Sequence, residues 1–327
     1  MLKRILFFVL LFSACPALFS FVKTNTQKAI RTIVIDAGHG GSDPGARGAY
    51  SYEKDICLDI ALKLGAQVQK EIPDVKIIYT RTTDSYPELH ARADLANQSK
   101  ADLFISIHVN SAPPTRHKKF NGYKYVGKGK KKKKVATYTY YTTPNPAKGT
   151  ETYIWGAHKN EDKEVAIREN APMLTEANYK EKYGDIDPNS PEFIALSLLK
   201  TKQFFKRSAT LAGLVEEQFT KVGRTSREVK QRQVGIWVLQ ATAMPSILVE
   251  TGFISDKGDE KYLNSQEGQI EISNCITTAL KGYVSIIEKQ QNATHSTQAP
   301  PAKINSSKDS KAFLDFIEQK EKKTVSR

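Results

Sequence analysis

The sequence predicts a single α/β domain with a twisted, mostly parallel sheet of about six strands flanked by helices. Apolar runs of strand length alternate with helical repeats between residues 31 and 110, which is the βαβ pattern of a parallel sheet. In addition, three of the apolar runs stop abruptly at a polar loop, as a buried strand does where it leaves the core. The length of 327 residues suits one large domain or two small ones.

The elements follow from the spacing of apolar residues. Strands are expected over residues 31–36, 75–80 and 101–108, and helices over 52–70 and 87–98. After an interruption, the expected order is a strand at 150–156, helices at 161–180 and 192–222, strands at 235–239 and 245–250, and a closing helix at 266–289. We therefore expect a catalytic domain over 28–289, with insertions at about 113–148 and 172–198.

The first insertion, residues 113–148, is polar and rich in Lys, Gly, Tyr and Thr. Lys128 and residues 130–134 form a basic cluster within it. We expect a solvated excursion, with a hairpin as one candidate form. Contact with an anionic envelope polymer and nucleic-acid binding are the functional alternatives to a plain loop.

The two ends of the chain differ in composition from the middle. Residues 1–20 have a basic start, an apolar stretch and then small residues, which is typical of a secretory signal peptide and too short for a membrane span. Cys15 lies in a poor lipoprotein-like box, so a lipid anchor there is an alternative to simple secretion into the periplasm or beyond. Residues 290–327 are predicted to be a flexible, low-complexity tail, and no later stretch is predicted to be transmembrane.

The net charge indicates the class of partner, and the positions of the cysteines indicate the state of their thiols. The formal net charge is +14, which favours an anionic partner such as a membrane surface, an acidic polymer or nucleic acid. No nucleic-acid motif accompanies the charge, so we do not expect nucleic acid. Cys57 and Cys275 lie in amphipathic patterns and are expected to be buried free thiols.

Three functional groups follow the ends of apolar runs. His39 follows the first strand within a glycine-rich loop, His108 ends the strand at 101–108, and Glu250 ends the strand at 245–250. Ligands of open α/β sheets bind at the carboxyl ends of the strands, so these three side chains can converge although they are far apart in sequence. Structural roles are the alternatives: a loop histidine, a buried hydrogen-bonded histidine and a salt-bridging glutamate.

Glu53 shares the stripe of the first helix that faces the sheet, together with Ile56 and Ile60. A carboxylate aimed at a core is costly unless it is paired or bound to metal, although Glu53 could instead stabilise the helix N-terminus. His39, Glu53 and His108 would make a two-histidine, one-carboxylate site of the kind that holds a catalytic zinc ion. Glu250 would then take the proton from water and pass it to the leaving nitrogen.

These motifs carry a resemblance to a known family. Residues 34–46, with the sequence VIDAGHGGSDPGA, resemble the opening motif of the zinc-dependent N-acetylmuramoyl-L-alanine amidases. Residues 106–112 (SIHVNSA) are similar to its second histidine motif, and residues 244–255 (MPSILVETGFIS) to the segment with its catalytic glutamate. Weaker matches at 89–97 and 150–153 extend the resemblance over about residues 31–288.

The resemblance implies hydrolysis of the amide between N-acetylmuramic acid and L-alanine in peptidoglycan, during wall turnover and daughter-cell separation. It implies one Zn²⁺ per chain held by His39, Glu53 and His108, with Glu250 as general acid/base. Some relatives carry a self-blocking helix where residues 172–198 lie, so Glu176 or Glu181 is a candidate autoinhibitory ligand, with a groove-shaping loop as the alternative. A monomer and an activator protein are also expected.

Three rival functions remain open on the sequence. The chain could be a non-catalytic envelope protein that binds peptidoglycan, although such a protein should lack one of the four site residues. It could be a zinc peptidase that cuts within the stem peptide. It could also bind nucleic acid through the basic cluster at 128–134.

Overall fold

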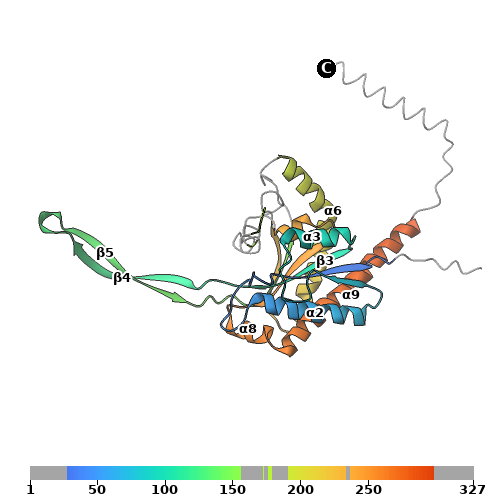
Figure 1. The fold of residues 1–327 in the computed structure, drawn as a ribbon, viewed down its shortest axis with the longest axis horizontal. Coiled ribbons are helices and arrows are strands. Elements are labelled where there is room, and N and C mark those ends of the chain that lie inside the picture. Colours follow the sequence, from blue (N-terminus) through green and yellow to red (C-terminus); the bar gives the residue numbers. More distant parts are fainter. Residues whose placement is uncertain (1–27, 156–171, 173–175, 179–190, 233–235, 298–327) are drawn as a thin grey trace, which may run out of the picture.

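The computed structural model describes residues 28–155, 172, 176–178, 191–232 and 236–297, and these form one α/β fold (Figure 1). A six-stranded sheet has the order β2-β1-β3-β8-β6-β7, and four of its five strand pairings are parallel. Its strands are β1 (Thr32–Ala37), β2 (Lys76–Tyr79), β3 (Leu103–Asn110), β6 (Thr150–Trp155), β7 (Ser226–Arg232) and β8 (Ser246–Phe253). The predicted fold class is confirmed.

Helices cover both faces of the sheet, and each face has its own apolar cluster. Helices α2 (Glu53–Glu71), α6 (Pro191–Lys221) and α9 (Gln266–Thr297) pack on the larger cluster, which holds alternate residues of β1, β3 and β8. Helices α3 (Leu89–Gln98) and α7 (Trp237–Ala241) pack on the smaller cluster, built on the other set of alternate residues. The alternation explains why β3 and β8 are buried at every position.

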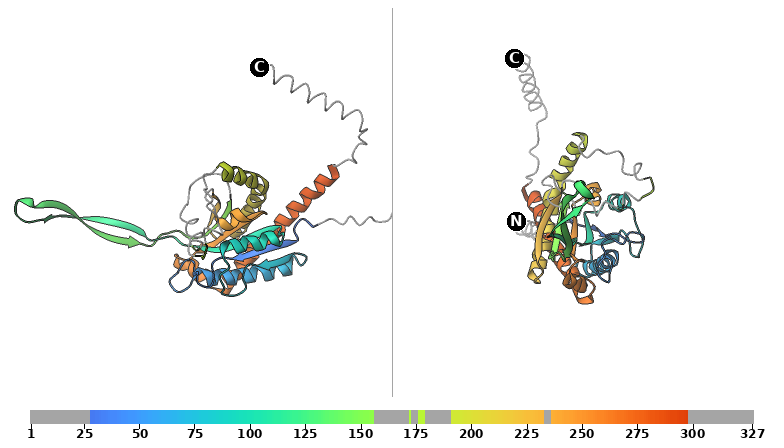
Figure 2. Two further views of the ribbon diagram at one scale, coloured as in Figure 1. Left: turned by 45° about the horizontal axis from the view of Figure 1, so that its top comes forward. Right: turned by 90° about the vertical axis from the view of Figure 1, so that its left-hand side faces the viewer.

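A long two-stranded hairpin leaves this fold between β3 and β6. Strands β4 (Thr115–Val126) and β5 (Lys133–Thr143) pair antiparallel in a sheet of their own, with the short helix η1 (Gly129–Lys131) at the tip. Figures 1 and 2 show the hairpin extending away from the body, so the predicted excursion at 113–148 takes the hairpin form.

Three elements differ from the sequence predictions. The run at 235–239 was expected to be a strand, but residues 237–241 form the helix α7, and a short apolar run cannot be assigned by periodicity alone. Strand β7 was not predicted, because its sequence SREVKQR has almost no apolar residues; it is an edge strand paired to β6 alone among the described strands. The short helix α8 (Lys257–Leu263) was also missed.

Other predictions can be compared in part. Helix α9 continues to Thr297, eight residues into the predicted tail, although those residues are polar. Cys57 and Cys275 are buried free thiols, as expected. The signal segment with Cys15, most of the predicted helix at 161–180, and residues 298–327 lie outside the described residues. Within the described part of the chain, none of the helices is both long and apolar enough to cross a bilayer.

Two glycines within helices provide opposite tests of this packing. Gly65 is buried in α2, and a Cβ there would lie 1.8 Å from the Tyr79 hydroxyl oxygen, so Gly65→Ala should lower the free energy of unfolding by about 1–3 kcal/mol. Gly213 is exposed in α6 with open space around it, so Gly213→Ala should raise that free energy by about 0.5–1 kcal/mol. Urea denaturation measures both. Equal effects of the two substitutions would contradict the α2–β2 packing.

Candidate metal centre and active site

The candidate site forms where β1 and β3 end. These strands are neighbours and parallel, and β1 also pairs with β2 on its other side. The chain therefore leaves β1 toward one edge of the sheet and returns in β3 to build the other, which creates a topological switch point between the two strands. Ligands of open α/β sheets bind in the crevice at such a point.

His39 lies in the loop directly after β1, in a backbone conformation that few non-glycine residues adopt. Its φ is 57°, and the following glycines also have positive φ, so the chain turns sharply and presents the imidazole to the site. The ring Nδ1 lies 2.7 Å from a carboxylate oxygen of Asp43. Because this contact holds one ring nitrogen, the other nitrogen, Nε2, is directed to a ligand.

Asp43 is suited to orienting His39. Partial burial alone would raise its pKa, but the contact with His39 and the Gly45 N–H outweigh burial and hold the pKa of Asp43 below its ordinary value. The carboxylate is therefore ionised near neutral pH and accepts a hydrogen bond from the Nδ1–H of the His39 imidazole.

Glu53 is the first residue of α2, and its side chain is completely buried. Its Oε1 lies 3.2 Å from His39 Nε2 and 3.1 Å from His108 Nδ1, and it accepts a hydrogen bond from the Val109 N–H. Its Oε2 accepts from the Ala46 N–H. The carboxylate is thus fixed by backbone N–H groups of the loop after β1 and of strand β3, and it lies between the two imidazoles.

His108 lies on β3 and completes the cluster. Its ring meets the His39 ring edge to face, with centroids 4.9 Å apart. A Cβ on Gly38 would lie 2.5 Å from His108 Cε1 and Nε2, so only glycine fits at position 38. This is a local reason for the glycine that precedes His39 in the motif.

The three side chains fit a zinc ion. Four ligand atoms at about 2.0–2.1 Å from a tetrahedral zinc are about 3.3 Å from one another. The two contacts of Glu53 Oε1, at 3.2 and 3.1 Å, are close to this spacing, and all three ligand atoms lie within 4.8 Å of one another. Two imidazoles and one carboxylate are also a donor set that zinc prefers, and three protein ligands leave a coordination position for water.

Glu250 lies beside this cluster on the neighbouring strand. It pairs in register with His108 of β3 on one side and with Glu151 of β6 on the other. Paired residues of adjacent strands are about 4.8 Å apart and point to the same face, so the three side chains form a row across the sheet. Glu250 is completely buried. The register brings Glu250 next to His108 at the carboxyl ends of their strands. The predicted convergence of Glu250 with His39 stays a prediction.

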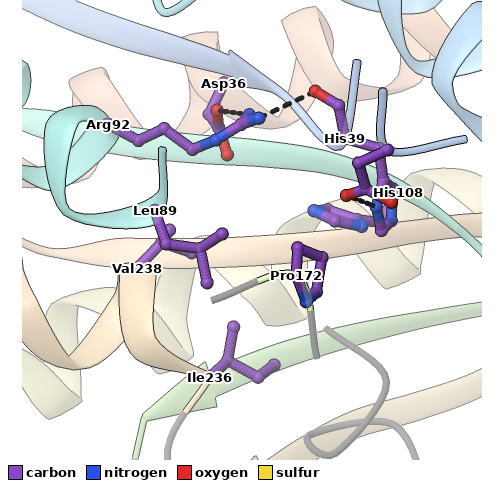
Figure 3. A pocket seen from close by; sticks show the side chains of 9 residues that line it. Asp36, His39, Leu89, Arg92, His108, Pro172, Ile236 and Val238 are labelled. Carbon is purple, nitrogen blue, oxygen red and sulfur yellow. Dashed lines mark hydrogen bonds and ion pairs between the residues drawn. The ribbon is translucent and has the colours of Figure 1, made fainter. Parts of the chain in front are cut away.

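Two buried arginines support the His39 loop. Arg92 of α3 donates to Asp36 and to the main-chain oxygens of Ala37 and His39, each at 2.7 Å, and Arg81 donates to the Gly38 oxygen. Figure 3 shows the Arg92 guanidinium between Asp36 and His39. The loop carbonyls therefore have fixed partners, and the position of His39 is set from both sides.

Asp36 is the counterion of this support. Burial alone would raise its pKa, but Arg92 and the hydroxyls of Ser106 and Thr80 outweigh burial, so the pKa of Asp36 is lowered. An ionised carboxylate and a guanidinium are therefore buried together. Removing one partner of such a pair is strongly destabilising.

A pocket opens beside the cluster (Figure 3). One wall is polar and comes from the ends of β1 and β3, and the other is apolar and includes Leu89, Ile236 and Val238. Pro172 also lines the pocket, which places one residue of the predicted insertion at 172–198 close to the histidines.

The two candidate autoinhibitory glutamates have different positions. Glu176 is buried, but it belongs to a second cluster, with Glu88 and His90, and not to that of His39, Glu53 and His108. Its carboxylate accepts hydrogen bonds from the Tyr86 hydroxyl at 2.7 Å and from the Leu89 N–H. Glu181 lies outside the described residues.

Sequence reasoning gave no role to four of the groups that build this site: Asp36, Asp43, Arg81 and Arg92. The signal for Asp36 was a charged residue within an apolar strand, and for Arg92 a charged residue three positions after Leu89 on the buried face of α3. Arg81 and Asp43 lie in loops and had no such signal. Their contacts with the His39 loop revealed them.

Comparison with known proteins assigns the family. The family model described as N-acetylmuramoyl-L-alanine amidase matches residues 33–282. The chain belongs to the N-acetylmuramoyl-L-alanine amidase family. The matched region includes all four predicted site residues and runs from β1 into α9.

Individual members of the amidase family agree with this assignment. A putative N-acetylmuramoyl-L-alanine amidase of Buchnera aphidicola subsp. Baizongia pistaciae is 30% identical over 261 residues, which cover 80% of this chain and 99% of that protein. AmiC of Escherichia coli O6:H1 is 28% identical over 77% of this chain, and AmiB of Haemophilus influenzae 31% over 87%. This chain spans 52% and 57% of the lengths of those two relatives.

A solved amidase structure has the same fold. The N-acetylmuramoyl-L-alanine amidase of Clostridium difficile 630 superposes with a TM-score of 0.51 at 25% identity, and the match covers 79% of this chain and 98% of that one. The α/β architecture is therefore that of amidase catalytic domains.

The contact between Asp43 and His39 predicts the effect of one substitution on metal affinity. Asp43→Ala removes the group that orients the imidazole, so it should weaken zinc binding by about 10–100-fold, as loss of an outer partner of a metal ligand does. Competition with a zinc-sensitive dye measures the affinity.

The control is Asp84→Ala. Asp84 is an exposed carboxylate whose described partners are the Gly41 N–H and the Lys54 ammonium group, neither of which belongs to an imidazole. Zinc affinity of this variant should stay within about threefold of the wild type. An equal loss in the two variants would mean that loop stability, and not orientation of His39, sets the affinity.

Proposed function

We propose that this protein is a zinc-dependent N-acetylmuramoyl-L-alanine amidase that hydrolyses the amide between N-acetylmuramic acid and L-alanine in peptidoglycan. The observation that carries the proposal is the buried cluster of His39, Glu53 and His108, with Glu250 in register beside it on β8. The substrate class is inferred from family membership, and zinc is inferred from the donor set of two imidazoles and one carboxylate.

Each residue has a defined task in this reaction. His39, Glu53 and His108 hold the ion, and Asp43 and the Val109 N–H keep two of these ligands in place. The chemistry that a bound zinc ion supplies is polarisation of the scissile carbonyl and a lowered pKa of water. Glu250 accepts a proton from water while the water oxygen adds to the carbonyl carbon. Glu250 then delivers that proton to the leaving nitrogen as the C–N bond breaks.

The biological setting is part of the proposal. We propose an envelope location, periplasmic or secreted, with residues 1–20 as signal peptide and Cys15 as the candidate lipid-anchor site. The proposed role is wall turnover and daughter-cell separation by a monomer, with an activator protein as a further candidate partner. The family match supports the wall as the place of action.

Glu250 and His39 should fail in different ways. Glu250→Gln should lower kcat by at least about 100-fold because it cannot accept a proton, while zinc content stays the same. His39→Ala should lose the metal itself. Elemental analysis and release of stem peptides from purified sacculi measure the two properties. Hydrolysis at the wild-type rate in Glu250→Gln would exclude Glu250 as the acid/base.

The products and a control variant complete this test. Glu216→Gln alters a buried carboxylate on α6 that accepts from Thr150, Thr152 and Ser226, and it should keep both zinc and kcat. Mass analysis of the digest, with and without chelator, separates the rival functions. Intact stem peptides and bare glycan indicate an amidase, and shortened stems indicate a peptidase.

We also propose that the insertion at 172–198 restrains basal activity, with Glu176 and Glu181 as the candidate blocking ligands. Pro172 at the pocket supports this, whereas Glu176 contacts Tyr86 and Leu89. Deleting residues 172–190 should raise the basal rate of purified protein on sacculi because it removes the pocket wall at Pro172. An unchanged rate would instead favour a loop that shapes the substrate groove.

A further inference from the structure

The β4–β5 hairpin carries most of the net charge of the chain. Residues 115–143 contain ten Lys or Arg residues and no Asp or Glu, whereas the whole chain has a formal net charge of +14. Nearly every side chain described along the two strands is exposed. The hairpin is therefore a cationic arm with both faces open to solvent.

A β-bulge collects the aromatic side chains of this arm on one face. Phe120 pairs with Tyr138, but the next pair is Tyr123 with Ala136, so β4 has one residue more than β5 between these pairs. Side chains alternate between faces along a strand. The extra residue therefore places Tyr123 and Tyr125 on the same face as Phe120. Without the bulge, both tyrosines would lie on the opposite face.

Ring contacts confirm that the residues share a face. The Phe120 ring meets those of Tyr123 and Tyr138 at centroid distances of 5.1 and 5.7 Å, and Tyr138 is followed by Tyr140 at 6.5 Å. Lysine ammonium groups lie over two of the rings, Lys118 over Tyr138 and Lys134 over Tyr123. We call this set the aromatic face; its rings are Phe120, Tyr123, Tyr125, Tyr138 and Tyr140.

The aromatic face is accessible. Tyr125 and Tyr140 are 68% and 73% exposed, and the least exposed of the five, Tyr138, is 40% exposed. Five large rings are costly to leave in water on a ribbon that has no core beneath it. The opposite face carries one aromatic residue of the same kind, Tyr141, which stacks on His117. The arm is therefore two-faced, and one face is suited to a partner.

The arm is attached at the active-site end of the sheet. Strand β4 begins five residues after Asn110, the last residue of β3, on which His108 lies. Strand β5 leads into β6, whose Glu151 pairs with Glu250. A polymer bound along the arm would thus extend to the active site that cleaves it. At about 3.4 Å per residue, a strand of β4's length is about 40 Å long.

We propose that the aromatic face and its lysines bind the polymeric substrate, a glycan chain that bears acidic peptides, and hold it for cleavage. This inference rests on the proposed function for the identity of the polymer. Sugar rings stack on aromatic faces, tyrosine hydroxyls can hydrogen-bond sugar hydroxyls, and lysines attract the peptide carboxylates. The arm has no acidic residue to oppose them.

Other partners fit the arm less well. Two copies of the arm would repel each other through their charge. Insertion into a membrane favours Trp, Phe and Leu, whereas four of the five rings are tyrosine, with polar hydroxyls. Single-stranded nucleic acid also stacks on rings, but the family acts on peptidoglycan. Membranes and nucleic acid are therefore outcomes of the test.

The test compares matched substitutions on the two faces of the full-length chain. The first variant is Tyr123→Thr, Tyr125→Thr, Tyr140→Thr. The control is Val126→Thr, Val135→Thr, Tyr141→Thr, which alters exposed residues of the opposite face. Threonine keeps the strand propensity in both. Co-sedimentation with purified sacculi, in chelator to prevent cleavage, gives the dissociation constant.

We expect the aromatic-face variant to bind sacculi at least about tenfold more weakly and the control to stay within about twofold. On active enzyme, KM for sacculi should rise, while kcat on a soluble disaccharide–peptide should not change. Replacing residues 115–143 by Gly-Gly should weaken binding at least as much as the aromatic-face variant does, because it removes the rings and the lysines together. The opposite-face control guards against a merely unfolded hairpin.

Three results would overturn the inference. Equal binding by both variants and the wild type would exclude the aromatic face. Equal loss in both would mean that the fold of the hairpin, and not its aromatic face, sets the affinity, because neither variant alters the charge of the arm. Face-dependent binding to phosphatidylglycerol vesicles or to an oligonucleotide, without such dependence for sacculi, would assign the arm to that partner. Because binding is measured without hydrolysis, failure of the amidase proposal would show separately, in the digest.

Discussion

The rest of the site depends on the contacts that the buried Glu53 carboxylate makes. It is fully buried at the start of α2, yet it touches both imidazoles and accepts hydrogen bonds from one N–H of the His39 loop and one of strand β3. A buried carboxylate would be unfavourable without such partners. The helix start, the His39 loop and the end of β3 are therefore constrained together, because each supplies part of the environment that a single anionic group requires.

Around this carboxylate, the protein fixes the candidate metal ligands mainly through main-chain atoms. Arg92 and Arg81 bind carbonyl oxygens of the loop that carries His39, and Asp36 neutralises Arg92. Gly38 leaves the space that the His108 ring occupies. Such an arrangement keeps the side chains in place before substrate arrives, so little reorganisation is needed during the reaction.

Much of the fold, and the clustering of the candidate ligands His39, Glu53 and His108, could be predicted from the sequence for a physical reason. Buried parallel strands are continuous apolar runs, and a polar residue at the end of such a run is conspicuous, as at His108 and Glu250. The prediction failed where that contrast is absent: β7 is polar, and α7 is too short to show its period. Arg81 and Asp43 could not be found, because their roles depend on contacts made only in the folded chain.

The face on which the rings of the arm lie depends on the number of residues in the β4 bulge. The five rings share a face because Asn121 and Gly122 together occupy the place of one residue opposite β5. Loss of either residue would leave every remaining amino acid of the ribbon unchanged, but it would rotate the outer rings to the far side. The orientation of the aromatic face thus depends on how many residues the bulge contains and not on which residues they are. A one-codon deletion would change this face more than several conservative replacements would.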